Sequence, residues 1–362
     1  MNVASADRVG QRARDYLRGK RVMVTGVCGT IGQRLASQLL GGFDIASLVG
    51  LDNNESQLSA LEEADATRGR ARFLLGDVRD PGVMARESRT VDVLFHAAAY
   101  KHVYLCERSP LEAIQTNVVG VQNVVQSAVE NAIERLVFTS SDKAVNPTNV
   151  MGTSKLMGER LITAASVDPN HSGSCFLSTR FGNVLGSRGS VIPIFREQIR
   201  RGGPVTLTHA NMTRFIMALD DAVRLVIESV VLGQPGDVLI TKMEAIRIAD
   251  LAAVMVREFA PRCGHRPQDI EIRLIGPKPG EKLYEELMND EETRRSVELN
   301  RYFVVRPALT PRADEPQSYD GIIRSSVEQP YNSANVQPLS QDQLAAFLYK
   351  NGLLDGPGRN QA

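Results

Sequence analysis

The chain has 362 residues and a mass of 39.6 kDa, and its 42 Lys and Arg residues balance 42 Asp and Glu residues. This zero net charge argues against a nucleic-acid-binding protein that relies on a basic surface to neutralise phosphates. Hydrophobic residues at 43% and charged residues at 23% are ordinary values for globular proteins, which excludes a globally disordered chain. The length is enough for one large α/β domain or two closely joined lobes.

Strands and helices alternate along the first half of the chain. Short apolar runs bounded by turn residues predict strands, and apolar residues at helical spacing predict helices. The predicted strands are 20–25, 46–51, 72–75, 91–96, 136–140 and 175–180. The predicted helices are 1–19, 33–40, 54–66, 111–131 and 152–165. This alternation is typical of βαβ units, so we expect an α/β fold with a Rossmann-type, doubly wound parallel sheet.

The regular alternation ends near residue 182. Two more helices are predicted at 220–232 and 248–259, a polar and Pro-rich surface excursion at 307–337, and a last helix at 339–353. We therefore expect three regions. They are a Rossmann domain at 1–184, to which 213–243 returns, a smaller C-terminal substrate-binding lobe at 185–330, and a tail with a helix at 331–362.

Signals for export, membrane insertion or metal binding do not stand out. No run approaches 18 uninterrupted apolar residues, and the N-terminal stretch has no apolar region of the kind a secretory signal needs. The four cysteines lie far apart in sequence and form no Cys/His cluster. We therefore expect a cytoplasmic protein with free thiols, no metal and no membrane span.

The first predicted strand and helix are joined by T-G-V-C-G-T-I-G, which has glycines at 26, 29 and 32. Glycines let this backbone turn tightly and approach a pyrophosphate, and the helix start offers N–H groups to it. Asp52 ends the second strand, where a carboxylate accepts from a ribose 2′-hydroxyl and repels a 2′-phosphate. NAD is therefore expected rather than NADP. A plain tight turn and a solvated loop acid are the alternatives.

Further cofactor contacts are expected where the third and fourth strands end. Asp77 and Val78 would meet the adenine, and the small residues Ala97–Ala99 would form a wall against the cofactor. The cofactor-binding residues expected from this arrangement are Gly26, Gly29, Thr30, Ile31, Gly32, Asp52, Asp77, Val78, Ala97, Ala98 and Ala99.

Polar residues gather where the fifth predicted strand gives way to the next helix. The strand runs into Thr-Ser-Ser-Asp-Lys at 139–143, and Met-Gly-Thr-Ser-Lys follows at 151–155. Ligands of parallel sheets bind at the carboxyl ends of the strands, so a hydroxyl, an acid and an amine are delivered where chemistry takes place. A surface ion pair between Asp142 and Lys143, with Ser141 as a helix cap, is the alternative.

These residues resemble the extended short-chain dehydrogenase/reductase superfamily, whose motif is Ser/Thr followed by Tyr-x-x-x-Lys. Ser141 matches the hydroxyl and Lys155 the lysine, while Met151 stands where the motif has tyrosine. More closely, the chain resembles the UDP-N-acetylglucosamine 4,6-dehydratases of polysaccharide biosynthesis (CapD-like), including a subgroup with methionine at that position. The matching stretches are HAAAYKHV (96–103), NVVGVQNVV (117–125), SSDKAVNPTNVMGTSK (140–155), RFGNVLGSRGSVIPIF (180–195), MTRFIMALDDAV (212–223) and KPGEKLYEEL (278–287).

Such a dehydratase removes hydride from C4 of the sugar, eliminates water across C5 and C6, and returns the hydride to C6. The resemblance implies that Asp142 is the acid at C6 and Lys143 the base at C5, with Lys155 hydrogen-bonded to the nicotinamide ribose. A thioether at 151 cannot take the C4 hydroxyl proton. That leaves Asp142, Lys143, a water held by Ser141, or Tyr100 for this role.

Met151 and Lys155 are four residues apart and share one helix face. The thioether is therefore expected to line the pocket, with plain core packing as the alternative.

The resemblance also implies one more cofactor contact, Asn117, and a set of residues that hold the UDP-sugar. The substrate-binding residues expected are Lys101, His102, Asn183, Arg188, Arg214 and Glu281. An arginine binds a diphosphate with paired donors, although any one of these side chains could instead be a solvated surface charge.

Relatives pair through two long helices, here 111–131 and 152–165, so we expect a homodimer or a larger homo-oligomer. The expected function is an NAD-dependent 4,6-dehydratase that converts UDP-N-acetylglucosamine, or a close UDP-sugar, to a 4-keto-6-deoxy sugar. A UDP-sugar 4-epimerase and a catalytically inactive NAD-binding regulatory protein are the alternatives.

Overall fold

The computed structural model describes residues 3–64, 69–168, 173–186, 190–277, 280–308 and 318–354. The chain forms two compact units built from alternating stretches of sequence. The first contains Met1–Phe181, Ala222–Lys242 and Met288–Pro330. The second contains Gly182–Asp221, Met243–Leu287 and Tyr331–Ala362.

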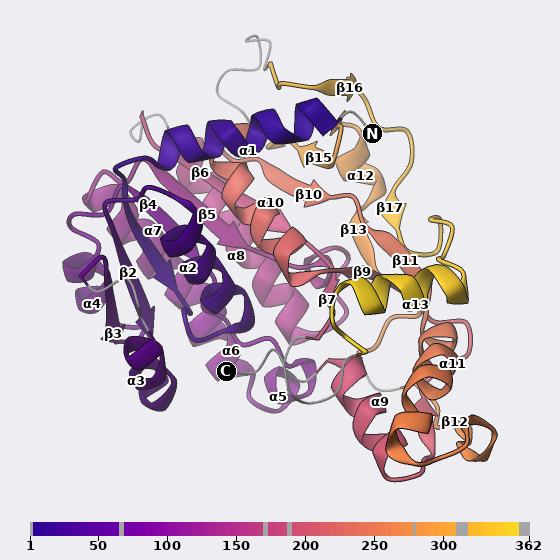
Figure 1. The fold of residues 1–362 in the computed structure, drawn as a ribbon. Coiled ribbons are helices and arrows are strands. Elements are labelled where there is room, and N and C mark those ends of the chain that lie inside the picture. Colours follow the sequence, from indigo (N-terminus) through magenta and orange to yellow (C-terminus); the bar gives the residue numbers. More distant parts are fainter. Residues whose placement is uncertain are drawn as a thin grey trace. The chain divides into compact units, whose positions relative to one another are not determined.

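Within the described residues, a ten-stranded sheet forms the centre of the first unit, in the order β16-β14-β15-β10-β6-β5-β4-β1-β2-β3 (Figure 1). Neighbours from β3 to β10 pair in parallel, and β15, β14 and β16 add in antiparallel fashion. The order 3-2-1-4-5-6 is that of the Rossmann fold, so the predicted doubly wound sheet is confirmed. The strands are β1 (Arg21–Thr25), β2 (Ser47–Asp52), β3 (Ala71–Leu75), β4 (Val93–His96), β5 (Arg135–Thr139), β6 (Cys175–Arg180), β10 (Val238–Thr241), β14 (Ser296–Leu299), β15 (Tyr302–Val305) and β16 (Ile322–Arg324).

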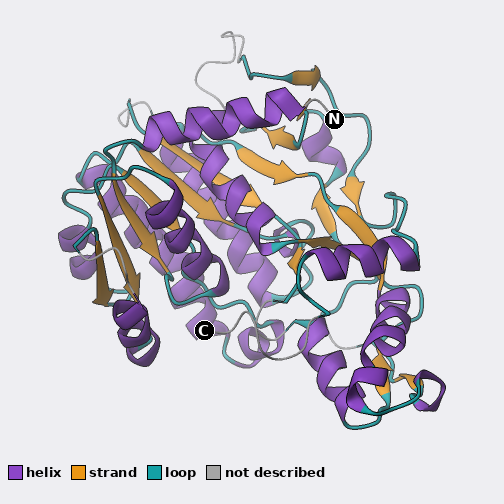
Figure 2. Ribbon diagram, viewed as in Figure 1, coloured by secondary structure: helices purple, strands orange, loops and turns teal. Residues whose placement is uncertain are grey.

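Helices cover both faces of this sheet. Successive side chains of a strand point to opposite faces, and the central strands are apolar at consecutive positions, so both faces are apolar. Met23, Leu94 and Leu136 point to one face, where they form a core with Val124 of α7 and Ile162 of α8. Helices α2 and α10 lie on the other face (Figures 1 and 2). The helices of this unit are α1 (Val3–Leu17), α2 (Thr30–Gly42), α3 (Glu55–Ala64), α4 (Pro81–Glu87), α5 (Val103–Arg108), α6 (Pro110–Ile114), η1 (Gln115–Val119), α7 (Gly120–Glu130), η2 (Asp142–Ala144), α8 (Val150–Ser166), α10 (Leu219–Leu232) and α12 (Asp290–Thr293).

The second unit has its own apolar core. Phe195 of α9, Leu251 and Met255 of α11, and Leu344 and Leu348 of α13 are buried together in it. Small sheets accompany these helices: β11-β9-β7, β12-β8 and β13-β17. The elements are β7 (Asn183–Val184), α9 (Val191–Arg200), β8 (Val205–Leu207), β9 (Thr213–Met217), β11 (Glu244–Arg247), α11 (Ile248–Phe259), η4 (Pro261–Cys263), η5 (Pro267–Asp269), β12 (Ile272–Leu274), β13 (Glu286–Met288), β17 (Tyr331–Asn332) and α13 (Gln341–Lys350).

These units differ from the predicted regions at three places. Residues 288–330, predicted in the substrate lobe, supply β14–β16 of the large sheet, because β14 and β15 form an antiparallel hairpin that adds to β10. In the returning segment, β9 belongs to the second unit, and α10 with β10 to the first. The described part of the predicted tail, residues 331–354, belongs to the second unit, since α13 packs into its core.

Two local predictions also differ from the structure. The predicted helix 111–131 is interrupted by a π-helical turn, η1, between α6 and α7. The polar excursion at 307–337 includes short strands β16 and β17 and a buried Tyr319, although residues 309–317 lie outside the described part. Of the helices in the described ranges, none is both long and apolar enough to cross a membrane.

Candidate active site

The glycine turn after β1 is closely packed against backbone on two sides. Gly26 has a φ of +70°, and a Cβ placed on it would lie 2.5 Å from the backbone N of Ala98. A Cβ on Gly32 would lie 2.1 Å from the carbonyl oxygen of Gly26. Glycine is therefore required at both positions for the turn to fold back so tightly.

The same turn delivers the start of α2. The helix follows Gly29, which is its N-cap and contributes no side-chain cap. Thr30, Ile31 and Gly32 form the first turn, whose N–H groups have no acceptor within the helix. These groups and the positive end of the helix dipole suit a pyrophosphate, so the turn fits the predicted dinucleotide.

Asp52 lies at the end of β2, beside this turn. Its carboxylate accepts the backbone N–H of Cys28 at 2.9 Å and that of Asn54 at 3.0 Å. A carboxylate oxygen can accept more than one hydrogen bond, so the group can also take a ribose hydroxyl. The first of these bonds ties Asp52 to the glycine turn itself.

The other predicted cofactor residues are held by protein contacts. Asp77 accepts from the Arg79 side chain at 2.7 Å and from Asn53 at 3.2 Å. Although burial raises the pKa of Asp77, these donors lower it below its ordinary value. Val78 is buried and packs closely on Gly120 of α7. Ala97–Ala99 are half-buried, and the backbone of this segment packs on Gly26.

Asn117 lies in η1 and is almost fully buried. Its amide oxygen accepts the N–H of Tyr100 at 2.8 Å, and its amide nitrogen donates to the Tyr100 carbonyl and the Ser154 hydroxyl, both at 2.9 Å. It therefore ties the segment after β4 to α8. π-helical turns often occur at functional sites, and this one places the amide between two predicted site segments.

The segment after β5 brings the predicted acid and amine together. The Asp142 carboxylate, whose side chain is 1% exposed, accepts the Lys143 ammonium at 3.1 Å and the Ser141 hydroxyl at 2.6 Å. The Ser141 oxygen also accepts the Lys143 N–H at 3.3 Å, as the cap of η2. The Lys143 side chain is 26% exposed, so the ion pair lies at the edge of the protein interior.

Helix α8 packs directly on this segment. The Asn149 side chain caps the helix by accepting the N–H of Gly152 at 2.8 Å. A Cβ on Gly152 would lie 2.1 Å from the Lys143 carbonyl oxygen, so glycine lets α8 approach the acid–amine pair. Gly152 was predicted only as the start of a helix. Its position directly after Met151, within the motif, was the available signal that it has a role at the site.

Met151 lies in the first turn of α8 and is buried. Its side chain packs with Cys106 and Ala113 in a small apolar cluster. This packing is compatible with the core-packing alternative, and the expected place of the thioether at the pocket stays a prediction.

Lys155 lies one turn further along α8 and is buried. Its ammonium donates to the Thr139 carbonyl at 2.9 Å and lies 4.7 Å above the centre of the Phe138 ring. Burial lowers the pKa of Lys155 to about 8, although the negative charge of Glu159 opposes this shift.

Residues 100–102, a few positions after β4, are exposed. The Tyr100 side chain is 41% exposed, and Lys101 and His102 lie on the surface, where His102 begins α5 as its N-cap. Their predicted contact with substrate stays a prediction.

In the second unit, Arg214 is buried and paired. Its guanidinium lies 3.1 Å from Glu285 and 3.8 Å from Glu281, and it donates to the carbonyl oxygens of Thr213, Lys282 and Leu283. Most of these contacts are with residues 281–285 and hold that segment in place. The expected contact of Arg214 with a diphosphate stays a prediction. Asn183 is half-buried in β7, and Arg188 lies outside the described residues.

Sequence reasoning missed a buried polar cluster beneath α8. Glu159 and Arg180 are almost fully buried and form an ion pair at 2.6 Å. Glu159 follows Lys155 by four residues, which was the available signal. As for metals, no group of three or more His, Cys, Asp or Glu side chains that could hold an ion occurs in the described ranges.

The Rossmann sheet, the glycine turn and the Ser…Lys pair across β5 and α8 define an extended short-chain dehydrogenase/reductase. The chain belongs to the family described as "Polysaccharide biosynthesis protein", whose profile matches residues 22–307.

Curated relatives support this placement. An uncharacterized membrane protein of Methanocaldococcus jannaschii is 46% identical, over 92% of this chain and 96% of its own. The capsular polysaccharide biosynthesis protein CapD of Staphylococcus aureus is 41% identical over 76% of this chain, which spans 46% of that longer protein. The UDP-glucose 4-epimerase of Rickettsia canadensis is 37% identical, over 91% and 95% of the two chains. The inverting UDP-N-acetylglucosamine 4,6-dehydratase of Campylobacter jejuni is 33% identical, over 80% and 84%.

Two solved structures are similar over most of the chain. Pen from Bacillus thuringiensis is 36% identical, with a TM-score of 0.85 over 93% of this chain and 99% of that one. The dTDP-glucose 4,6-dehydratase DesIV of Streptomyces venezuelae, solved with NAD and TYD bound, is 25% identical. Its TM-score is 0.64 over 73% and 86% of the two chains. The chain is thus an enzyme of the nucleotide-sugar dehydratase and epimerase class.

Proposed function

We propose that the protein is an NAD-dependent 4,6-dehydratase acting on UDP-N-acetylglucosamine or a close UDP-sugar. The observation that carries this proposal is the Asp142–Lys143 pair at the end of β5, joined at 3.1 Å. Elimination of water requires one proton to leave C5 and another to reach the C6 hydroxyl. An acid and an amine side by side can perform both transfers.

The two groups lie within reach of each other for proton transfer. The Asp142 carboxyl group is buried and would donate a proton to the C6 hydroxyl. The Lys143 amine, whose side chain is 26% exposed, would take the proton from C5. The Ser141 hydroxyl, hydrogen-bonded to Asp142, would orient the carboxyl group.

NAD would be held by the glycine turn, the first turn of α2, Asp52 and Lys155, and when bound it would supply the hydride acceptor at C4. Because the thioether of Met151 cannot take a proton, the C4 hydroxyl proton needs another acceptor. Asp142, Lys143, a water on Ser141 and Tyr100 stay the candidates. In the second unit, we assign the nucleotide to Asn183 and Glu281, with Arg214 holding the segment that carries Glu281.

A UDP-sugar 4-epimerase is the second candidate, because a Rickettsia relative of that name aligns over 91% of this chain. The two activities differ in product mass. We expect incubation with UDP-N-acetylglucosamine and NAD to give a product lighter by one water. An isomer of unchanged mass would identify an epimerase, and NAD binding without turnover would identify an inactive regulatory protein.

The carboxylate of Asp52 should set the cofactor preference. We expect NAD to bind more tightly than NADP. Asp52→Ala should lower the affinity for NAD about 10–100-fold, because a hydrogen bond to a charged group is lost. Calorimetric titration with both cofactors measures the ratio. Asp77→Ala is the matched control and should affect both cofactors alike. Equal affinities for NAD and NADP in the unaltered protein would contradict the assignment.

Exposed apolar side chains on α5, α6 and α8 suit the predicted homodimer. Leu111 is 72% exposed and Met157 48% exposed, whereas Val121 and Val125 face the core. We expect Leu111→Asp combined with Met157→Asp to convert a dimer into a monomer, measured by light scattering. Leu75→Asp on β3, where the side chain is 64% exposed, is the control and should leave the dimer intact. An unaltered protein that is monomeric at micromolar concentration would refute the dimer.

A further inference from the structure

A row of buried charged side chains lies between α8 and the large sheet. In it, acidic and basic groups alternate: Lys155 and Glu159 on α8, Arg180 at the end of β6, and Glu292 in α12. Each of these four residues is at most 6% exposed. Burying charge is costly unless partners compensate for the lost hydration, so the row must be held together by specific contacts.

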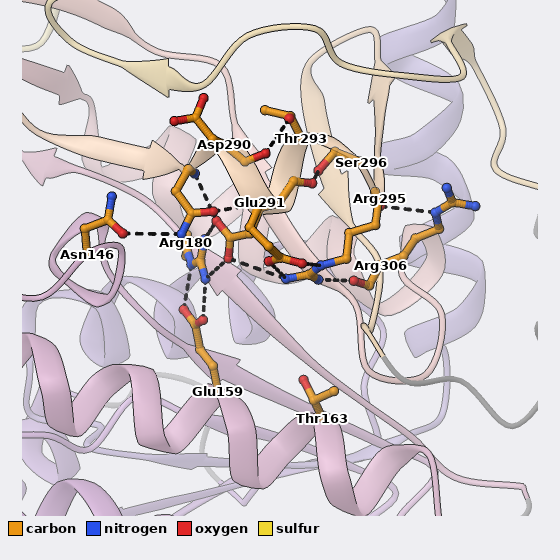
Figure 3. Close-up of polar contacts among 12 residues, drawn as sticks. Asn146, Glu159, Thr163, Arg180, Asp290, Glu291, Thr293, Arg295, Ser296 and Arg306 are labelled. Carbon is orange, nitrogen blue, oxygen red and sulfur yellow. Dashed lines mark hydrogen bonds and ion pairs between the residues drawn. The ribbon is translucent and has the colours of Figure 1, made fainter.

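Arg180 and its two carboxylates form the tightest part of the row. The guanidinium donates to both oxygens of Glu159, at 2.7 and 2.6 Å. It donates to both oxygens of Glu292, at 2.7 and 2.9 Å. Figure 3 shows Arg180 pointing toward Glu159 on the α8 helix. Two-pronged pairs of this kind fix both position and orientation.

Glu159 is also tied to the strand that leads into the catalytic segment. One of its oxygens accepts the Ser140 hydroxyl at 2.5 Å. Lys155, four residues earlier on the same helix, donates to the carbonyl of Thr139. Thr139 and Ser140 are consecutive residues, and they are held by Lys155 and Glu159 from consecutive turns of α8. Lys155 and Glu159 therefore lie next to each other on the same face of the helix.

The Thr139 carbonyl and the Phe138 ring also face the Lys155 ammonium, and Glu159 adds a full negative charge on the same helix face. Burial lowers the pKa of Lys155 to about 8, and the Glu159 charge acts in the opposite direction. Since the depressed pKa belongs to a base, the charged fraction is high below about pH 8 and falls as the pH rises through that value.

We propose that Glu159 is a positioning residue that keeps the Lys155 ammonium charged at the cofactor site. Arg180, itself paired with Glu292, holds Glu159 in place and partly neutralises its charge. The role of Lys155 at the cofactor rests on the function proposed above. The charge state itself is a property of the free protein.

Other titratable groups face Lys155 or the helix that carries it. His96 of β4 is fully buried, with a ring nitrogen 2.6 Å from the Thr25 hydroxyl. Burial and the Lys155 charge lower the pKa of His96 to about 3, so it stays neutral over the range in which Lys155 titrates. Asp142 and Lys143 in η2 also pack against α8, but they pair with each other.

The direct test is the titration of Lys155 itself. The chain contains eight lysines, so NMR of protein labelled at the lysine side chains gives few signals, and the Lys155 signal is the one lost in Lys155→Met. We expect Glu159→Gln to lower the Lys155 midpoint by about one pH unit or more, because an adjacent opposite charge is removed. Glu292→Gln is the matched control. It makes the same chemical change on the other side of Arg180 and should move the midpoint much less.

A structural role alone predicts similar effects of the two Gln variants on the midpoint, and that result would overturn the proposal. If Glu159→Gln does not fold, the double variant Arg180→Met with Glu292→Gln tests the same point with the opposite sign. In this variant Glu159 no longer pairs with Arg180, so its negative charge acts more strongly on Lys155 and the Lys155 midpoint should rise. An unchanged midpoint would refute the proposal.

NAD titration over the same pH range separates this proposal from the proposed function. The affinity of the unaltered protein should fall as Lys155 loses its proton, and the fall should occur at lower pH in Glu159→Gln. If the protein does not bind NAD at any pH, the proposed function fails while the NMR titration still decides the role of Glu159.

Discussion

Lys143→Ala should lower the rate of water loss from UDP-N-acetylglucosamine by about 10²–10⁴-fold, the usual contribution of a general base. The fold should persist, because the Asp142 carboxylate keeps the Ser141 hydroxyl and the backbone N–H of residue 143 as donors, at 2.6 and 2.9 Å. Product mass measures elimination, and absorbance of reduced nicotinamide measures oxidation at C4. We expect slow oxidation without loss of water.

Two further variants make this result specific. Asp142→Asn should also stall after oxidation if Asp142 is the C6 acid alone. If oxidation is lost as well, Asp142 takes the C4 proton too. Met151→Leu conserves volume in an apolar cluster and should retain most activity, at a stability cost below about 1.5 kcal/mol. A Met151→Leu enzyme as inactive as Lys143→Ala would show that the thioether has a direct role.

Arg180→Met should destabilise the folded protein by about 3–5 kcal/mol, the usual cost of breaking a buried ion pair on one side. The guanidinium is 1% exposed and serves two carboxylates that are each 3% exposed. Without it, Glu159 and Glu292 would be buried without a cationic partner at this position. Denaturant unfolding of both proteins measures the difference in the free energy of unfolding.

The pH dependence identifies the cause. Burial raises the pKa of Glu292, but Arg180 more than offsets this, so the pKa lies below its ordinary value. In the variant the Asn289 N–H and the Arg295 charge still lower the pKa of Glu292, but the effect of Arg180 is gone, so this pKa should rise. A higher pKa of a buried carboxyl group lowers the free energy of unfolding as the pH rises through that pKa. The defect should therefore be smaller at pH 5 than at pH 8. Arg72→Met is the control, since its pair with Glu87 is exposed and worth at most about 1 kcal/mol. A small, pH-independent effect of Arg180→Met would refute the argument.

Local sequence patterns predicted the parallel part of the fold well, because each βα unit carries its own signals. Hydrophobic runs marked β1 to β6, and the glycine spacing marked the turn into α2. The hairpin of β14 and β15 carries equally apolar residues, but its partner β10 lies more than 50 residues earlier in the chain. Nothing in a local window shows which sheet such a hairpin joins, so it was placed in the wrong region.

The candidate site divides in the same way. The place of Asp142 and Lys143 at the end of β5 was predicted from the local pattern, and their ion pair was foreseen only as an alternative on the surface, whereas Asp142 is buried. The donors of Arg214 could not be foreseen to face carbonyl groups of 282 and 283, because that contact joins segments about 70 residues apart. Glu159 escaped notice for a related reason. A helix pattern shows that a residue faces inward, but it does not show that Arg180 of β6 lies there and pairs with the Glu159 carboxylate.

Positions 151, 155 and 159 recur every four residues along α8, so about 6 Å of helix separates each from the next. Each position meets different neighbours: the first an apolar cluster with Cys106 and Ala113, the second the end of β5, and the third Arg180. This spacing separates the first position from the other two. A substitution at 151 changes the apolar cluster and leaves the contacts of Lys155 and Glu159 in register. A one-residue insertion within the helix would instead rotate the downstream positions by about 100° and dismantle the row at once.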